Sequence, residues 1–441
     1  MVSSHLLVQK SVCSGGFAMT ALFTLSVCLL SGLLLSRLAK KLGLPAVTAY
    51  LIAGLLLGPF CIGSLGLEGL GFTSLEQVSA YNVISQAALG FIAFAIGNEF
   101  RLQQLRQMGR AAIVIGILQA VLTTALVDVV LLGLHFWKPQ LISTAAALTL
   151  GAIAAATAPA ATLMVVRQYK ADGPLTRLLL LVVAIDDAVG LVLFAVSFGV
   201  ASALTSGAVS VVSVVVEPLV EIILSLGLGV LLGLLLNRLE RYFHSRSKRL
   251  SVSVGCVALT VAISSTEFTV GGVHCGFSLL LVCMMMSTVF CNICDFSEEL
   301  MGRVDGWTTP LFVLFFVLSG AELDLTILKN PAVLLLGVAF IVSRSAGKYL
   351  GAFSSAALCR CDPQTRKYLG ITLLPQAGVA LGMAITAATL PDGALARNVV
   401  LFSVLVYELV GPALTKRSLL AVGEIKPEGR TSARKENMPK L

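Results

Sequence analysis

Apolar runs long enough to cross a bilayer follow one another along almost the entire sequence. A spanning helix needs about 20 apolar residues. A content of 57% hydrophobic and only 12% charged residues also excludes an ordinary soluble domain. The sequence therefore predicts an all-α polytopic membrane protein of about 13 transmembrane helices. The candidate spans are 17–38, 45–62, 82–98, 111–136, 141–166, 175–204, 209–236, 250–265, 273–290, 307–320, 332–357, 368–390 and 397–415.

Basic residues are shared unequally between the two sets of loops that these spans define. The segments after odd-numbered spans, with the C-terminal tail, hold 25 of the 31 basic residues, and the opposite side holds 4. Because cytoplasmic loops collect Lys and Arg, we expect the N-terminus outside and the C-terminus in the cytoplasm, in a plasma membrane of the bacterial inner-membrane type. The net charge of +8 follows from this bias and requires no nucleic-acid partner.

Ionisable residues lie inside two of the predicted spans. Asp186 and Asp187 interrupt the sixth span, and Arg344 and Lys348 lie four residues apart, on one helical face, in the eleventh. A charge at that depth is costly, so such residues indicate a functional site by default. Opposite charges in two different spans indicate an ion pathway.

Two short patterns recur in the second half of the chain. The pattern G-x-E-apolar-x-L at Gly97 returns at Gly320, and prolines interrupt the fifth and twelfth spans at Pro159 and Pro375. Seven crossings separate the equivalent points, so the second set of helices is expected to be inverted. Inverted repeats that each contain a broken helix are typical of secondary transporters, which are not enzymes.

The repeats define the predicted domain organisation. A membrane transport domain covers 1–416, with repeats over about 17–204 and 250–415 and a linker helix over 209–236. A basic cytoplasmic tail, 417–441, follows, and its polar composition predicts disorder.

The prolines, the acids and the lysine fall at similar depths in the bilayer. At 1.5 Å per helical residue, all of them lie about 12 to 18 Å from the cytoplasmic flanking charges, near the middle of a core about 30 Å thick. This layer comprises Pro159, Pro375, Asp186, Asp187 and Lys348. We therefore expect the ion site at the middle of the membrane.

Oxygen atoms in this layer suit a small monovalent cation. Proline removes a helical hydrogen bond, so the stretch before Pro159 exposes carbonyl groups beside the hydroxyl of Thr157. Asp187 or Asp186 binds a cation only when deprotonated, so Na⁺ or K⁺ competes with H⁺ for one carboxylate. A carboxylate that crosses with either ion, and poorly as a bare charge, performs antiport. Apart from the transported ions no cofactor is expected, and Gln376 is expected to line the cavity or cap the second break.

The charged residues allow more than one assignment. We expect Asp186 to pair with Lys348 and Asp187 to be the cation ligand, but adjacent helical residues point about 100° apart, so the roles can also be exchanged. Glu408, in the last span, is the expected partner of Arg344 in a structural strut. The structural alternative is a buried salt-bridge network that only specifies helix packing.

Together the motifs resemble the second monovalent cation:proton antiporter family, which includes bacterial sodium/proton antiporters and Kef-type potassium efflux systems. The resemblance covers about Thr20 to Lys416 and rests on GLPAVTAYLIAGLLLGP at 43–59, G-x-E-F at 97–100, TAPAAT, AIDDAVG, the R-x-x-x-K of the eleventh span and LLPQAGVALG. It implies two crossed discontinuous helices in an antiporter fold of the NhaA and NapA type. It also implies a homodimer whose core domain moves against a dimerisation domain, with Asp186 paired to Lys348 and Asp187 binding the ion.

The acid pair favours Na⁺/H⁺ exchange among the activities that the resemblance implies. Kef-type members usually replace the first acid and carry a nucleotide-binding domain, whereas the tail after Lys416 has no G-x-G-x-x-G motif. K⁺/H⁺ exchange by the same machinery stays open, because oxygen ligands alone do not separate the two ions. A sodium-coupled organic-anion symporter is a third hypothesis, against which the midplane lysine argues. A channel would need more polar residues in its spans.

Overall fold

Helices make up most of the computed structural model, which describes residues 2–42, 44–66, 69–98, 100–206, 217–266, 268–270, 273–323, 329–388, 390 and 392–425. The first half contains α1 (Val2–Lys41), α2 (Ala46–Leu57), the 3-10 helix η1 (Ile62–Leu65), α3 (Leu75–Ser79), α4 (Asn82–Gly97), α5 (Leu102–Trp137), α6 (Thr144–Ile153), α7 (Pro159–Gln168) and α8 (Pro174–Ser206). The second half contains α9 (Glu217–Tyr242), α10 (Arg246–Ser264), β1 (Phe268–Val270), β2 (Val273–Cys275), α11 (Leu279–Ile293), α12 (Ser297–Ala321), α13 (Pro331–Leu358), α14 (Pro363–Thr372), α15 (Gly378–Ala387) and α16 (Gly393–Val422).

In the part of the chain that the structure describes, each of the thirteen predicted spans falls largely on one helix or on a pair of short helices, and residues 209–216 of the predicted linker helix lie outside the described residues. Within the described ranges, nine helices are long and apolar enough to cross a membrane, and three shorter apolar helices, α4, α6 and α11, join them. The chain is therefore a mainly α-helical, multi-pass membrane protein. The number of spans itself stays a prediction.

Three boundaries differ from the sequence prediction. The short span over 307–320 is the end of α12, which begins ten residues earlier, because hydropathy locates the apolar part of a helix rather than its polar first turn with Glu298 and Glu299. Residues 273–275 form β2, paired antiparallel with β1, although a helix was predicted to start there. α16 continues through 417–422, so the predicted tail starts later, and 426–441 lies outside the described residues.

Two helices are interrupted, as the prolines predicted. α6 ends at Ile153 and α7 starts at Pro159, which takes the first helical position, where its missing N–H costs nothing. In the second half, α14 ends at Thr372 and α15 starts at Gly378, and Pro375 lies between them. We call residues 154–158 the first break and residues 373–377 the second break.

Capping residues lie at the starts of α6 and α14, the first half-helix of each broken pair. The Ser143 hydroxyl accepts a hydrogen bond from the Ala146 N–H at the start of α6. The Asp362 carboxylate accepts one from the Thr365 N–H at the start of α14. Such caps satisfy backbone donors that have no partner within the helix.

The second half of the chain repeats the element pattern of the first with a constant offset. α6 and α14 have ten residues each, as do α7 and α15. The starts of α14, α15 and α16 (Pro363, Gly378 and Gly393) follow the starts of α6, α7 and α8 (Thr144, Pro159 and Pro174) by 219 residues each. This regularity is what two structural repeats produce. The boundaries of the repeats as domains stay a prediction.

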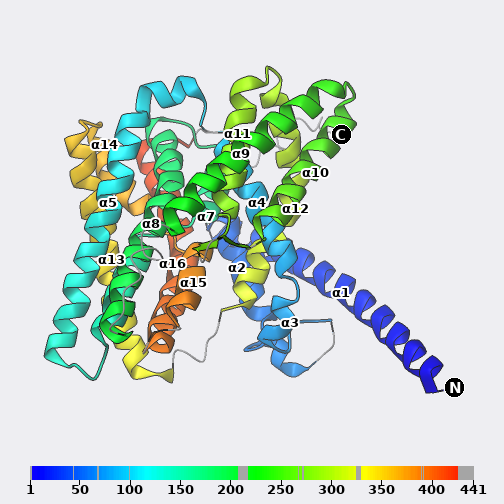
Figure 1. The fold of residues 1–441 in the computed structure, drawn as a ribbon, viewed down its shortest axis with the longest axis horizontal. Helices are drawn as coiled ribbons and strands as arrows, with labels where there is room; N and C mark the ends of the chain where they lie inside the picture. The colour runs from blue at the N-terminus through cyan, green and yellow to red at the C-terminus, as the bar shows by residue number, and fades with distance from the viewer. Residues whose placement is uncertain are drawn as a thin grey trace. The chain divides into compact units, whose positions relative to one another are not determined.

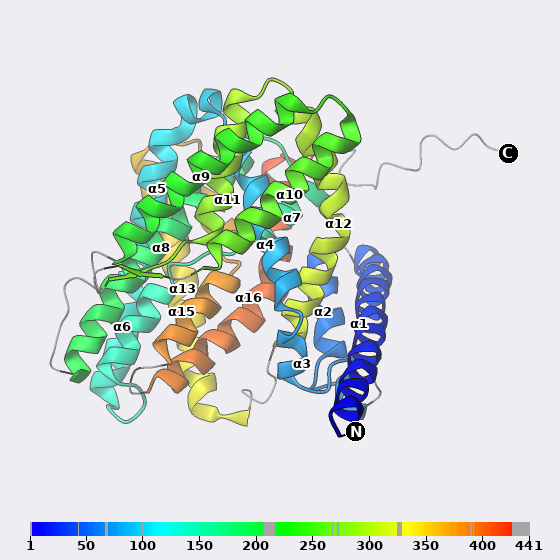
Figure 2. The ribbon, with the colours of Figure 1, turned by 45° about the vertical axis from the view of Figure 1, so that its right-hand side comes forward.

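The chain divides into two compact units. The smaller comprises Met1–Ala88 and Thr308–Thr326. In it α1 packs along α2 (Figure 2), and a Cβ on Gly54 of α2 would lie 1.8 Å from the Val317 carbonyl oxygen of α12. Only glycine permits that approach of two backbones.

The larger unit, Leu89–Trp307 with Ile327–Leu441, contains both broken helices and the residues of the candidate site. In this unit α13 packs against α5 (Figure 1), where Gly347 and Gly351 let the backbones approach closely. A Cβ on either glycine would come within 3 Å of the Cα atoms of Thr123 or Gln119. Small residues at such crossings are typical of membrane helix packing. The close contact brings the polar side chains of α5 and α13 to one place.

Candidate functional site

The two adjacent acids lie in the interior of α8 and are buried. Asp186 has no exposed surface, and Asp187 is 2% exposed. α8 forms because 174–206 is an apolar stretch of helix-compatible residues, and two carboxylates within it are costly to bury.

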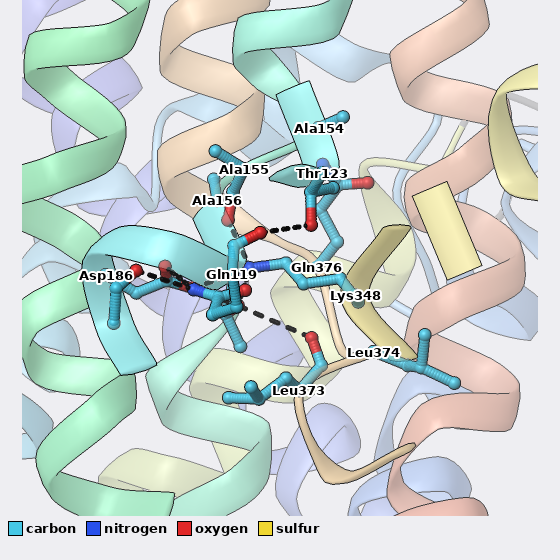
Figure 3. Close-up of polar contacts among 12 residues, drawn as sticks. Gln119, Thr123, Ala154, Ala155, Ala156, Asp186, Lys348, Leu373, Leu374 and Gln376 are labelled. Atoms are coloured by element: carbon cyan, nitrogen blue, oxygen red, sulfur yellow. Dashed lines mark hydrogen bonds and ion pairs between the residues drawn. The ribbon is translucent and has the colours of Figure 1, made fainter. Parts of the chain in front are cut away.

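Asp186 is surrounded by hydrogen-bond donors from three other elements (Figure 3). The Lys348 ammonium of α13 lies 2.7 Å from its Oδ2, and the Thr157 hydroxyl of the first break donates to the same oxygen at 2.5 Å. The Gln119 amide of α5 donates to Oδ1. Three donors, one of them cationic, stabilise the ionised carboxylate. The predicted contact of Asp186 with Lys348 is thus present.

Lys348 also neutralises the end of a half-helix. Its ammonium donates to the Ala155 carbonyl oxygen at 2.5 Å and to the Thr157 hydroxyl oxygen at 2.9 Å. The carbonyl groups that follow α6 carry the negative end of its dipole, so a cation there is favourable. Thr157 therefore accepts from Lys348 while it donates to Asp186, and it fixes the distance between them.

Arg344 connects the two breaks. Its guanidinium donates to the carbonyl oxygens of Ala154 at 2.9 Å and Ala156 at 2.7 Å in the first break, and to that of Leu374 at 2.8 Å in the second. Its Cζ atom lies 4.4 Å from the centre of the Tyr407 ring. The side chain is fully buried, and its donors satisfy carbonyl groups that no helix pairs.

Glu408 was the predicted partner of Arg344, and the hydrogen bonds recorded for the guanidinium go elsewhere. They end on backbone oxygens of the two breaks, and the neighbouring residue Tyr407, not Glu408, supplies the ring contact. Glu408 is 4% exposed and lies on the same helix, α16. Arg344 therefore joins the two breaks through their backbone carbonyls, and the strut with Glu408 stays a prediction.

Gln376 and the backbone complete the crossing of the two breaks. The Ala158 N–H donates to the Pro375 carbonyl oxygen at 2.8 Å. The Gln376 amide donates to the Ile153 carbonyl oxygen at 3.0 Å, and its own oxygen accepts from the Ser403 hydroxyl at 3.2 Å. Gln376 therefore binds the end of α6 beside the first break, and its predicted roles of lining the cavity or capping the second break stay predictions.

Asp187 differs from its neighbour. Neither of its carboxylate oxygens has a hydrogen-bond partner among the described residues, although the side chain is buried. A buried carboxylate without donors is costly, and a proton or a bound cation is what removes that cost. Oxygen is the ligand that hard cations such as Na⁺ prefer. The geometry therefore distinguishes a carboxylate held by donors, Asp186, from one free to exchange its ligand.

Sequence reasoning did not identify Gln119, which is fully buried and contacts Asp186. Its amide also donates to the Gly116 carbonyl oxygen at 3.1 Å, and its own oxygen accepts from no described donor. An amide in the middle of the apolar span 111–136 was the available signal, since polar side chains in such spans usually face the bundle interior.

Comparisons with known proteins agree with this architecture. The family described as "sodium/hydrogen exchanger, transmembrane" matches residues 25–420. A structure of the sodium proton antiporter MjNhaP1 from Methanocaldococcus jannaschii at pH 8 matches with 20% identity over 91% of this chain and 98% of that one, with a TM-score of 0.64. An electron-microscopy structure of the same antiporter gives 18% identity, coverage of 96% and 99%, and a TM-score of 0.67. At these identities the structures establish a shared fold.

Proposed function

The chain belongs to the sodium/hydrogen exchanger family, and on that premise we propose that it is a secondary active antiporter that exchanges Na⁺ for H⁺ at Asp187. K⁺/H⁺ exchange by the same residues is the close alternative, because the size of the cavity rather than the type of ligand decides between the ions.

The contrast between Asp186 and Asp187 carries this proposal. Asp186 accepts hydrogen bonds from Lys348, Thr157 and Gln119, so a proton or cation would have to displace three donors to reach it. Asp187 has no such competitors. It therefore takes up a proton when the solution that faces the site is acidic. It binds a cation when it is deprotonated. Thr157, which was expected to be a cation ligand, bonds to Asp186 and Lys348, so we propose that it contributes chiefly by positioning Asp186.

The Asp186–Lys348 pair contributes almost no net charge to the site. One positive and one negative charge at 2.7 Å cancel, so the net charge of the pair does not change when Asp187 exchanges its ligand. Movement of the site across the membrane is then permitted when Asp187 carries a proton or a cation. It is opposed when Asp187 is a bare anion. This coupling is the physical basis of antiport.

An elevator-like motion is the form of alternating access that the contacts favour. Arg344 and Gln376 join the two breaks, and Lys348 joins α13 to α8, so these elements are expected to move together as one body. We place them in the mobile core of a homodimer, with the N-terminus outside and the C-terminus in the cytoplasm. A sodium-coupled organic-anion symporter would not need a lysine paired with one of its acids.

Transport by purified protein in proteoliposomes tests the proposal. With an imposed pH gradient, addition of Na⁺, K⁺ or Li⁺ is expected to change internal pH in the wild type. In Asp187→Asn the response should be abolished, because an amide neither releases a proton nor balances a cation. Glu76→Gln, which changes an exposed carboxylate outside the site, is the matched control and should keep the wild-type rate. Exchange retained in Asp187→Asn would refute the site, and no response to any cation in the wild type would favour the symporter.

A further inference from the structure

The start of α8, the helix that carries both acids, is capped by a residue from the far end of the chain. The first N–H groups of a helix have no partner within it. The Glu424 carboxylate accepts hydrogen bonds from the Leu175 N–H at 2.7 Å, the Thr176 N–H at 2.7 Å and the Thr176 hydroxyl at 2.5 Å. Glu424 is 6% exposed. A buried anion at the positive end of α8 is favourable by charge as well as by hydrogen bonding.

The backbone on both sides strengthens this contact. The Asp172 N–H donates to the Glu424 carbonyl oxygen at 3.0 Å, and Ala171 forms an antiparallel bridge with Ile425. Gly423, with a φ of 82°, ends α16 and turns the chain toward α8. We call this arrangement of 423–425 on 171–176 the C-terminal clamp.

Gly173 marks how closely the two segments approach. A Cβ at Gly173 would lie 2.4 Å from the Glu424 Cδ atom. Only a residue without a side chain lets the carboxylate sit over the first turn of α8.

The clamp joins two helices that both hold the candidate site. α16 carries Ser403, which bonds Gln376 in the second break, and Tyr407, which lies against Arg344. α8 carries Asp186, twelve residues after its start at Pro174, or about 18 Å along the helix. A rigid helix transmits a displacement of its end to its middle, and an ion site tolerates errors of only about 0.5 Å.

We propose that Glu424 is a positioning residue for ion exchange, which fixes the depth and rotation of α8 so that Asp187 is presented correctly while Asp186 meets Lys348. The inference rests on the proposed antiport function. It assigns a transport role to the short segment 423–425 and none to the residues after it.

Two truncations separate the clamp from the rest of the tail. A chain that stops after Ile425 keeps every clamp contact and should show an apparent KM for the cation within about twofold of the wild type. A chain that stops after Val422 loses the clamp, and its apparent KM should rise about tenfold, since small misplacements far from a site have effects of this size or larger.

Point variants guard against a failure to fold. Glu424→Gln keeps one acceptor for Leu175 but offers an amide where Thr176 donates, so an intermediate rise in apparent KM is expected. Gly173→Ala should displace the carboxylate and have a similar effect without removing a charge. The matched control is Asp172→Asn, which breaks the exposed Asp172–Arg177 ion pair in the same loop and should leave KM unchanged.

Hydrogen exchange provides a readout that does not depend on transport. Glu424→Gln should speed amide exchange at 154–158 and 183–190 as well as at 174–178. Faster exchange confined to 174–178, or an unchanged KM in a less stable protein, would show that Glu424 is only a helix cap and would overturn the proposal. A wild type that transports no ions would instead refute the antiport function. The pattern of amide hydrogen exchange would still decide the role of the clamp.

Discussion

The two breaks occupy equivalent places in the two halves of the chain. Arg344 contacts both of them, but among the described residues the hydrogen bonds of Lys348 and Asp186 reach only the first. With the offset of 219 residues that relates the starts of α6 and α14, Thr157 corresponds to Gln376. Thr157 lies between an ammonium and a carboxylate, whereas Gln376 contacts only neutral groups, the Ile153 carbonyl and the Ser403 hydroxyl.

The helices that follow the breaks explain this difference. α8 presents Asp186 and Asp187, and the equivalent positions on α16 are Leu405 and Val406. The repeated scaffold therefore supplies two crossed breaks, and the proposed ion chemistry lies beside one of them. The second break serves as its support, held through Arg344.

Removing the lysine should have the largest effect on the first break. In Lys348→Ala, Asp186 loses the one cation that forms an ion pair with it among the described residues, and breaking a buried ion pair costs about 3 to 5 kcal/mol of stability. If the proposed roles hold, the pH profile and the charge moved per cycle should change more than the affinity for the cation. Thermal unfolding in detergent and electrogenic transport in proteoliposomes measure the two effects.

A double variant sharpens the same test. Lys348→Ala with Asp186→Asn removes both charges, and replacement of a whole buried pair is often neutral, so most of the lost stability should return. If the double variant is as unstable as the single one, Lys348 acts through the Ala155 carbonyl rather than through Asp186.

The main features of this asymmetry could be predicted from sequence, because they involve residue types that are unfavourable in an apolar helix. Charge in an apolar span and proline in a helix are unfavourable wherever they occur, so Asp186, Lys348, Pro159 and Pro375 were identified without coordinates. The equality of the half-helices was visible only as a weak repeat of proline-containing motifs.

Contacts between residues that are far apart in the chain could not be predicted from the sequence in this way. Gln119 and Glu424 act on α8 across 67 and 248 residues, and neither neighbouring sequence nor spacing indicates such contacts. The hydrogen bonds of Arg344 are a further example. A carboxylate on another helix was the obvious choice for a guanidinium, but unpaired backbone carbonyls of two breaks, which exist only in the folded state, take its donors.

Removing the hydroxyl of the first break should have an intermediate effect. Thr157→Val keeps the shape but removes a donor to Asp186 and an acceptor for Lys348, so about 1 to 3 kcal/mol is lost. We expect cation affinity to fall about tenfold, the equivalent of 1.4 kcal/mol. Thr157→Ser keeps the hydroxyl oxygen and should retain most of the affinity for the cation. Cation-dependent thermal stabilisation measures the affinity, and an equal loss in the valine and serine variants would contradict a role for the hydroxyl.

Gln376→Leu should have the smallest effect on transport, because it changes the equivalent position in the break that carries no ion chemistry. Leucine fills a similar volume but leaves the Ile153 carbonyl and the Ser403 hydroxyl without this partner, which should lower stability by about 1 to 3 kcal/mol. The affinity for the cation should stay within about twofold, because no contact of Asp186 or Asp187 is lost. Comparing its cation titration with that of Thr157→Val tests the asymmetry directly. If the two variants lose affinity equally, the second break is part of the ion site and the division between chemistry and support is wrong.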